Sequence, residues 1–232
     1  IIPKALTIAY DKLTRQTDGR PGKMYWQNRA VYDIRVKVDV KNKIISGHET
    51  ISYLNNSPDS LSKIVLRLYQ DIFKKGANRN SIVNVNPSDI KEGVRINDLR
   101  VAGESVNPVN SPGINRSGTI MTIKLTKKLA PGEKAELAIG WEFDFPVNTL
   151  IRMGTIDSSS LFVGQWYPQI AVYDDVYGWD TRSYNGMAEF YNDFSDFTVE
   201  ISVPDGFMIW ATGELQNMEE VLSPQYCDLY NK

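Results

Sequence analysis

The single histidine of the chain, His48, precedes Glu49 in the run Gly47–Ser52, and this residue pair opens the zinc-binding pattern H-E-x-x-H. In that pattern two histidines four residues apart share one face of a helix. Here the second histidine position holds Ser52. The run also lies in a predicted strand, where adjacent side chains point to opposite faces. It therefore predicts a surface histidine on a strand, and no metal site.

Other candidates for chemistry are equally weak. Cys227 has no basic neighbour in sequence that would activate its thiol, and there is no Gly-x-Ser-x-Gly nucleophile elbow. The adjacent carboxylates Asp174-Asp175 and Glu219-Glu220 are typical of solvated turns. A carboxylate pair that meets only in the fold, as in glycoside hydrolases, stays an open alternative. We predict no catalytic residue and no metal ligand in this chain.

Composition narrows the class of protein. The 232 residues include 26 Lys and Arg, 28 Asp and Glu, one His and one Cys, with a formal net charge of -2. A single Cys excludes an internal disulfide. The near-zero charge gives no basic footprint for nucleic acid, and no apolar run reaches the roughly 18 residues of a membrane span. The length suits one or two domains, although all-β domains alone often reach roughly 200–250 residues.

Apolar and polar residues alternate in many short runs, and this period of two is typical of half-buried strands. A tight turn at Pro204-Asp205-Gly206 separates the last two runs. The sequence thus predicts an all-β fold, an antiparallel β-sandwich or saddle-like open sheet with long loops. We expect an irregular N-terminal segment at 1–30 and one β-sandwich domain at 31–216. The predicted strands are 31–40, 44–54, 64–69, 94–101, 119–125, 135–145, 197–203 and 207–212.

The segment 161–191 is unusually rich in Trp, Tyr and Phe and lies between two alternating strands. Such a loop either folds over the sandwich or lines a binding cleft, and both alternatives stay open. We single out Trp166, Tyr167 and Trp179 as residues of a domain interface or of a ligand site.

Several motifs in and around this segment resemble bacterial members of the aminopeptidase N-like family of zinc metallopeptidases. The resemblance spans about residues 25–216 and is most specific between 165 and 215. Its motifs are Tyr32–Ile34, Ile45–Gly47, Gln165–Pro168, Val172–Asp174, Gly178–Trp179, Glu189–Phe194, Phe197–Pro204 and Ala211–Leu215.

The resemblance implies the non-catalytic N-terminal domain of such an enzyme, a saddle-like β-sandwich. That domain packs against a catalytic domain and caps the cleft that binds peptide N-termini. Residues 217–232 would form a stub leading toward an absent catalytic domain, which would hold the zinc. This chain alone would have no cofactor and no hydrolase activity. Its partners would be its own catalytic domain and peptide substrates, and its location the periplasm or the extracellular space, with the cytoplasm as the alternative.

In that family the N-terminal domain contributes a Gln or Glu that contacts the substrate amino group, several residues before the segment matching Trp166–Pro168. The corresponding stretch here, 155–160, has neither. Asp157 and Gln165 are the nearest candidates for a substrate-binding role. Two other functions stay open: a stand-alone carbohydrate- or protein-binding β-sandwich, and a domain of a catalytically dead peptidase-like scaffold.

Overall fold

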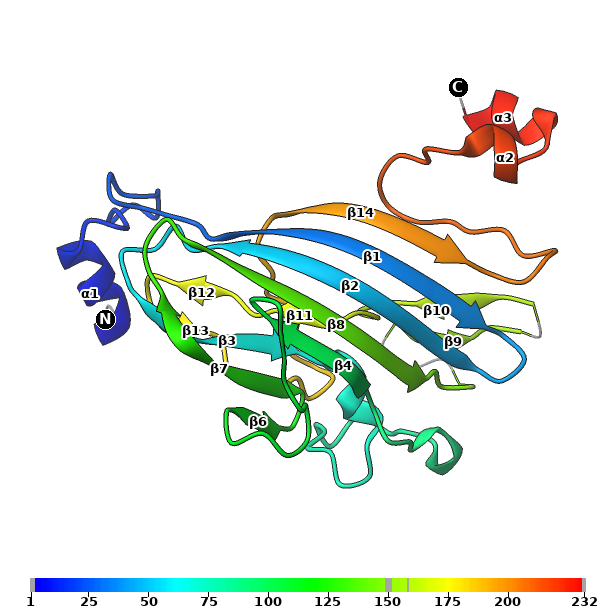
Figure 1. Cartoon of the computed structure of the whole chain (residues 1–232), viewed down its shortest axis with the longest axis horizontal. Helices are drawn as coiled ribbons and strands as arrows, with labels where there is room; N and C mark the ends of the chain where they lie inside the picture. The colour runs from blue at the N-terminus through cyan, green and yellow to red at the C-terminus, as the bar shows by residue number, and fades with distance from the viewer. Residues whose placement is uncertain (1–2, 149–151, 158, 231–232) are drawn as a thin grey trace.

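A computed structural model describes residues 3–148, 152–157 and 159–230 of the chain. Two β-sheets pack face to face in it, with long connections at their edges, as Figure 1 shows. The all-β fold class predicted from sequence alternation is confirmed. The sheets do not close into a barrel among the described strands.

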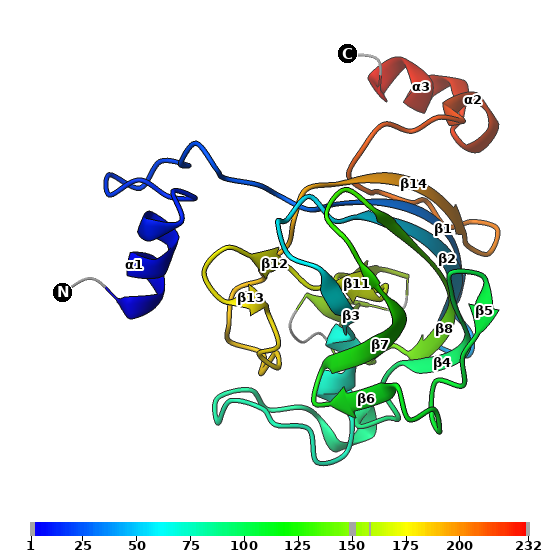
Figure 2. The ribbon, with the colours of Figure 1, turned by 60° about the vertical axis from the view of Figure 1, so that its left-hand side comes forward.

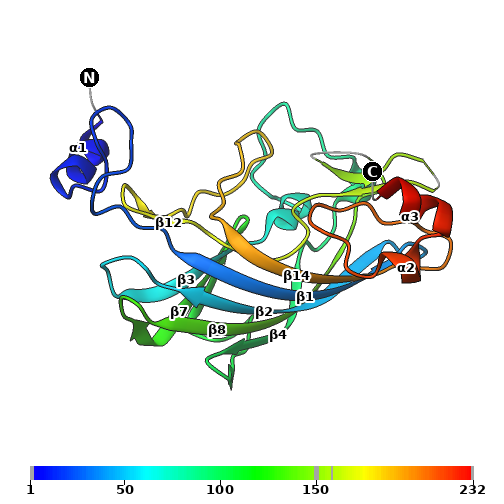
Figure 3. The same ribbon diagram turned by 90° about the horizontal axis from the view of Figure 1, so that it is seen from above.

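The larger sheet has six strands in the order β14-β1-β2-β8-β4-β5, seen side by side from above in Figure 3. Its neighbours are antiparallel except β1 and β14, which run parallel. The short link after Asp39 makes a hairpin, in which Asp39 pairs with Ile44. The strands are β1 (Arg29–Asp39), β2 (Ile44–Leu54), β4 (Arg95–Val101), β5 (Glu104–Ser105), β8 (Lys134–Asp144) and β14 (Ser195–Ser202).

The smaller sheet has four strands in the order β11-β3-β7-β6, and the larger sheet curves over it in Figure 2. Two short hairpins extend from the edges of the sandwich. The smaller sheet comprises β3 (Leu61–Arg67), β6 (Ile114–Ser117), β7 (Ile120–Leu129) and β11 (Gln169–Ile170). The hairpins pair β9 (Met153–Thr155) with β10 (Leu161–Val163), and β12 (Tyr173–Asp174) with β13 (Gly178–Trp179).

Helices are short and lie at the periphery: α1 (Lys4–Asp11), the 3-10 turns η1 (Tyr69–Phe73) and η2 (Pro87–Asp89), α2 (Met218–Val221) and α3 (Pro224–Tyr230). In Figures 1 and 2, α1 stands at one end of the molecule, whereas α2 and α3 stand clear of the sheets beyond β14. No helix in the described part of the chain is long and apolar enough to cross a membrane.

The core lies between the sheets and follows the sequence alternation. In β2 the buried residues Ile45, Ile51 and Tyr53 share one face. On the same face of the sheet, the neighbouring strand β8 contributes Trp141 and Phe143. Because a strand's alternate side chains share a face, the predicted apolar rows of β1, β2 and β8 all become this core. Full burial of such side chains contributes roughly 1.5–3 kcal/mol each.

Two local expectations were wrong. Segment 1–30, which was expected to be irregular, contains helix α1. Residues 207–212 form no strand, although the sequence predicts one: the turn at Pro204 is present, with Phe207 N–H donating to the Pro204 carbonyl, but no ladder follows. Strand formation depends on pairing and packing more than on intrinsic preference, and Trp210 remains 79% exposed.

Candidate functional site

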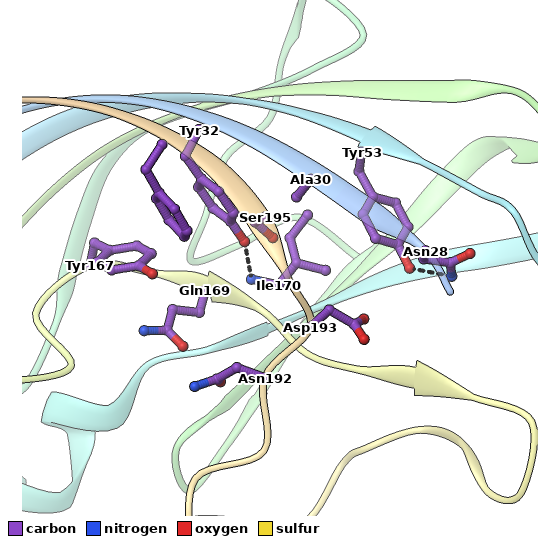
Figure 4. Close-up of a pocket in the computed structure, with 11 residues that line it drawn as sticks. Asn28, Ala30, Tyr32, Tyr53, Tyr167, Gln169, Ile170, Asn192, Asp193 and Ser195 are labelled. Atoms are coloured by element: carbon purple, nitrogen blue, oxygen red, sulfur yellow. Dashed lines mark hydrogen bonds between the residues drawn. The ribbon is translucent and has the colours of Figure 1, made fainter. Parts of the chain in front are cut away.

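A recess of about 190 Å³ opens where β1 and β14 pass over the segment around β11 (Figure 4). We call it the Asp193 recess. It is lined by Asn28, Ala30, Tyr32, Tyr53, Tyr167, Gln169, Ile170, Asn192, Asp193, Ser195 and Phe197. Pockets for drug-sized ligands are larger, roughly 300–1,000 Å³, so this one suits a small chemical group.

One end of the recess is aromatic. The rings of Tyr32 and Phe197 stack, with centroids 4.9 Å apart and planes 7° from parallel. Tyr167 meets both rings edge-on, with its centroid 5.6 Å from Tyr32 and 5.8 Å from Phe197. The Ile170 N–H donates to the Tyr32 hydroxyl over 3.0 Å, and this bond fixes the ring against β11. Because β1 and β14 are parallel neighbours in register, Tyr32 and Phe197 lie side by side on one face.

The other end is polar. In Figure 4 the Asp193 side chain points toward Tyr53 and Asn28. Asn28 donates to the Tyr53 hydroxyl over 2.7 Å, and its amide oxygen accepts from the backbone N–H groups of Asn56 and Ser57. The hydrogen bonds of the Asn28 side chain are therefore used to fix Tyr53 and the loop after β2.

Asp193 is different, because no hydrogen bond or ion pair among the described residues involves its carboxylate. Burial, with a further contribution from the nearby charge of Asp174, raises the pKa of Asp193 to about 6. Asp174 itself accepts from the Tyr191 hydroxyl over 3.0 Å and from the N–H groups of Val176 and Tyr177. A half-buried carboxylate without a partner thus faces a second carboxylate that has only neutral donors.

The long segment that contributes Asp193 is anchored by charge. Arg67 in β3 is buried and forms an ion pair with Asp180, and it donates to the Arg182 carbonyl over 2.9 Å. At the other side, Arg15 binds Asp175 over 2.7 Å and ties the N-terminal segment to the same loop. Buried ion pairs of this kind fix geometry more than they add stability.

The two residues proposed for substrate binding lie apart from the recess. Asp157 is exposed, and its carboxylate accepts from the backbone N–H groups of Ser159 and Ser160, which lower its pKa. Gln165 is half-buried with a left-handed φ of 46°, and its backbone carbonyl accepts from Gln70. Their role toward a substrate stays a prediction.

The three singled-out aromatic residues are half-buried and pack on other rings. Trp166 lies 5.9 Å from Trp141 and 4.9 Å from Tyr167 between ring centroids. Trp179 lies 5.9 Å from Tyr53 and also contacts the buried patch of the smaller sheet's outer face. Segment 161–191 therefore folds over the sandwich, and only Tyr167 of the three lines the recess.

His48 and Glu49 point to opposite faces of β2, as predicted: His48 is exposed and Glu49 is fully buried. Neither carboxyl oxygen of Glu49 has a hydrogen-bond partner, and burial raises the pKa of Glu49 well above its usual range. Across residues 3–148, 152–157 and 159–230, no group of three or more His, Cys, Asp or Glu could hold a metal ion. The described residues therefore do not supply a zinc site.

Sequence reasoning missed Asp193 and the burial of Glu49. The inward row of β2 runs through positions 45, 47, 49, 51 and 53, so Glu49 was visible as a charged residue on the core face. No comparable signal marks Asp193, because much of the recess around it is formed by strands far away in sequence.

Comparisons with known proteins give a distant likeness. No protein-family model matches the chain, and no curated protein matches it. It is similar to the solved M1 zinc metallopeptidase of Deinococcus radiodurans, at 18% identity and a TM-score of 0.42, covering 80% of this chain and 34% of that chain. It is also similar to a mutant two-domain M1 zinc metallopeptidase bound to L-arginine, at 18% identity and a TM-score of 0.43. That match covers 80% of this chain and 35% of that chain. Aminopeptidase A of Legionella pneumophila, in complex with aspartic acid, is similar at 8% identity and a TM-score of 0.33. That match covers 56% of this chain and 11% of that chain.

This chain thus spans about a third of the length of the first two of these structures. Identity and superposition at this level do not establish the family to which it belongs.

Proposed function

We propose that this chain is the non-catalytic N-terminal β domain of a zinc-dependent aminopeptidase-like metallopeptidase. In the whole protein it would pack against a catalytic domain and cap the cleft that receives peptide N-termini. The support comes from the sequence motifs between residues 165 and 215 and from an uncovered apolar surface that coincides with them.

That surface lies on and after β14. Phe197 and Val199 stand on the same sheet face as the core residues Tyr32 and Ile34 of β1, yet they are 49% and 41% exposed. The smaller sheet does not extend far enough to cover them. A core-facing apolar row left open to solvent is typical of a surface that meets another domain.

The chain following β14 continues this apolar character. Met208, Ile209 and Trp210 are all exposed, and the chain then leads to α2 and α3, away from the sheets. The apolar surface on β14 is thus followed in the chain by the exposed apolar segment 208–210. This is the single observation that carries the proposal, because a following domain would meet that surface first.

The proposal is tested by comparing this 232-residue chain with the complete product of its gene. We expect the chain alone to bind no stoichiometric zinc and to leave an aminoacyl-arylamide intact. The complete product should contain a further domain, bind one zinc and hydrolyse the substrate. Zinc-dependent turnover by the chain alone, or a gene product without a further domain, would overturn the proposal.

The comparison with the complete gene product, together with a glycan array, separates the two alternative functions. A complete product that has the further domain but lacks zinc and activity would identify a catalytically dead scaffold. A stand-alone carbohydrate-binding module would instead bind a defined glycan in an array and lose it on Trp166→Ala or Trp179→Ala. The packing of both indole rings against other aromatic rings favours the peptidase domain over this module.

A further inference from the structure

We propose that the Asp193 recess is a binding site for an organic cation, an alkylammonium or guanidinium group carried on an apolar stem. The site is separate from the candidates Asp157 and Gln165, and the inference does not depend on the proposed function.

The shape of the recess separates two kinds of contact. Asp193 lies toward the end marked by Tyr53 and Asn28, and Tyr167 lies at the opposite end in Figure 4. Gln169 and Asn192 lie between these ends. A ligand with a charged head and an apolar stem matches this order, because the head would meet the carboxylate and the stem would meet the aromatic rings.

The charge of the recess selects a cation. Asp193 is the one charged side chain among the eleven residues that line it. The titratable groups that face Asp193 are Asp174 from β12, Tyr53 from β2 and Tyr191 from its own segment, and none of them is cationic. Arg15 of the N-terminal segment, whose charge acts on Tyr191, is already bound to Asp175.

An anionic ligand would add a third negative charge beside Asp193 and Asp174, at a cost in a partly desolvated site. A neutral ligand could donate a hydrogen bond to the half-buried carboxylate but would leave its charge unbalanced. A cation forms a charge-assisted hydrogen bond with it, and the aromatic rings at the other end add apolar contacts with the stem. Of the three classes, only the cation improves the electrostatics of the recess as it stands.

Binding should depend on pH in a defined direction. With a pKa of about 6, Asp193 is ionised in about a tenth of molecules at pH 5 and in about nine tenths at pH 7. The affinity for a permanently charged cation should therefore rise about tenfold between these values.

The test is a titration of the chain with n-butylammonium, followed by NMR and calorimetry, with n-butylguanidinium as a second cation and 1-butanol as the neutral control. We expect both cations to shift the amide signals of residues around Asp193, with affinity rising from pH 5 to pH 7, and 1-butanol to bind at least tenfold more weakly. The matched variants are Asp193→Asn and Asp196→Asn. Asp196 is three residues away, exposed and bound to Arg29, so its variant should keep full affinity.

Loss of cation binding in Asp193→Asn, with retained binding in Asp196→Asn, would support the site. The pH dependence of the unaltered chain tests the proposal independently, should Asp193→Asn fail to fold. Equal affinity for 1-butanol, a flat pH profile, or equal binding by both variants would overturn it. A short peptide with one internal Lys separates the two sources of the cation: tighter binding than n-butylammonium indicates a side chain of a partner protein, and weaker binding indicates a free amine.

Discussion

Glu49 makes the stability of this protein depend on pH in an unusual direction. Its carboxyl group is fully buried on the core face of β2, flanked by Ile34 on β1 and Ile139 on β8, and has no hydrogen-bond partner. Burial raises its pKa well above the ordinary value of 4.5. The folded protein therefore keeps this proton at pH values where the unfolded chain has lost it.

The sign follows from proton linkage. Above pH 4.5 the unfolded chain releases the Glu49 proton and gains free energy of ionisation, whereas the folded chain does not. The stability contributed by neutral Glu49 is present in full below pH 4.5. It is lost as pH rises toward the folded-state pKa, at about 1.4 kcal/mol per pH unit. The loss continues until the pH reaches the folded-state pKa, and each pH unit removes a sizeable part of the stability of an ordinary domain.

The perturbation is Glu49→Gln, which keeps the size of the side chain and removes its titration. We expect the free energy of unfolding of the variant, relative to the unaltered chain, to rise with pH above pH 5, by up to about 1.4 kcal/mol per pH unit. Other acids with raised pKa, such as Asp193 and Asp71, titrate in both proteins and cancel in this difference. A Glu49→Met variant should show the same pH trend, because it also lacks the titrating group.

The assay is urea unfolding, followed by tryptophan fluorescence and circular dichroism at half-unit steps from pH 5 to pH 8. Glu104→Gln in β5 is the matched control, because Glu104 is exposed and its variant should follow the unaltered chain at every pH. Parallel stability curves for Glu49→Gln and the unaltered chain would refute the reasoning. They would mean that Glu49 ionises in the fold at an ordinary pKa, with water or a rearranged donor beside it.

Two further changes test the packing that positions the long aromatic segment. Gly47→Ala places a Cβ 2.6 Å from Cζ2 of Trp141, so we expect a loss of about 1–3 kcal/mol in urea unfolding and a changed near-ultraviolet dichroism signal; an unchanged midpoint would contradict the close approach. Arg67→Met leaves the Asp180 carboxylate without its cation and should lower the free energy of unfolding by about 3–5 kcal/mol. Adding Asp180→Asn should recover part of this stability. The exposed pair of Arg100 gives the control, since Arg100→Met should cost less than about 1 kcal/mol, and equal costs would refute the role of burial.

Much of the sandwich could be predicted from sequence, because a half-buried strand leaves its period of two in the chain. β2 occupies the expected residues 44–54, and β8 differs from its predicted range by one residue at each end. These strands form long ladders with neighbours on both sides, so packing and pattern agree.

The remainder depends on contacts that no local pattern encodes. Residues 207–211 form an apolar run that would suit a strand, but only a partner strand would convert it into one. The parallel pairing of β14 with β1 joins residues about 165 positions apart, and this pairing forms one wall of the Asp193 recess. A sequence can show that Asp193 is acidic, but not that its neighbours leave it unpaired.

The same mismatch between the two sheets accounts for both the recess and the apolar surface. Six strands lie over four, so the inner face of β14 projects past the smaller sheet. Where β11 and the following loop still reach beneath it, at Tyr32 and Phe197, a partly covered recess forms. On the same face of β14, Phe197 and Val199 stay 49% and 41% exposed, so the apolar row there is open. A domain that covers this row would also border the recess, because Phe197 belongs to both. Cation binding at Asp193 and docking on β14 should therefore influence each other, and since coupling of two ligands is reciprocal, a partner that weakens butylammonium binding must itself be released by butylammonium to the same extent.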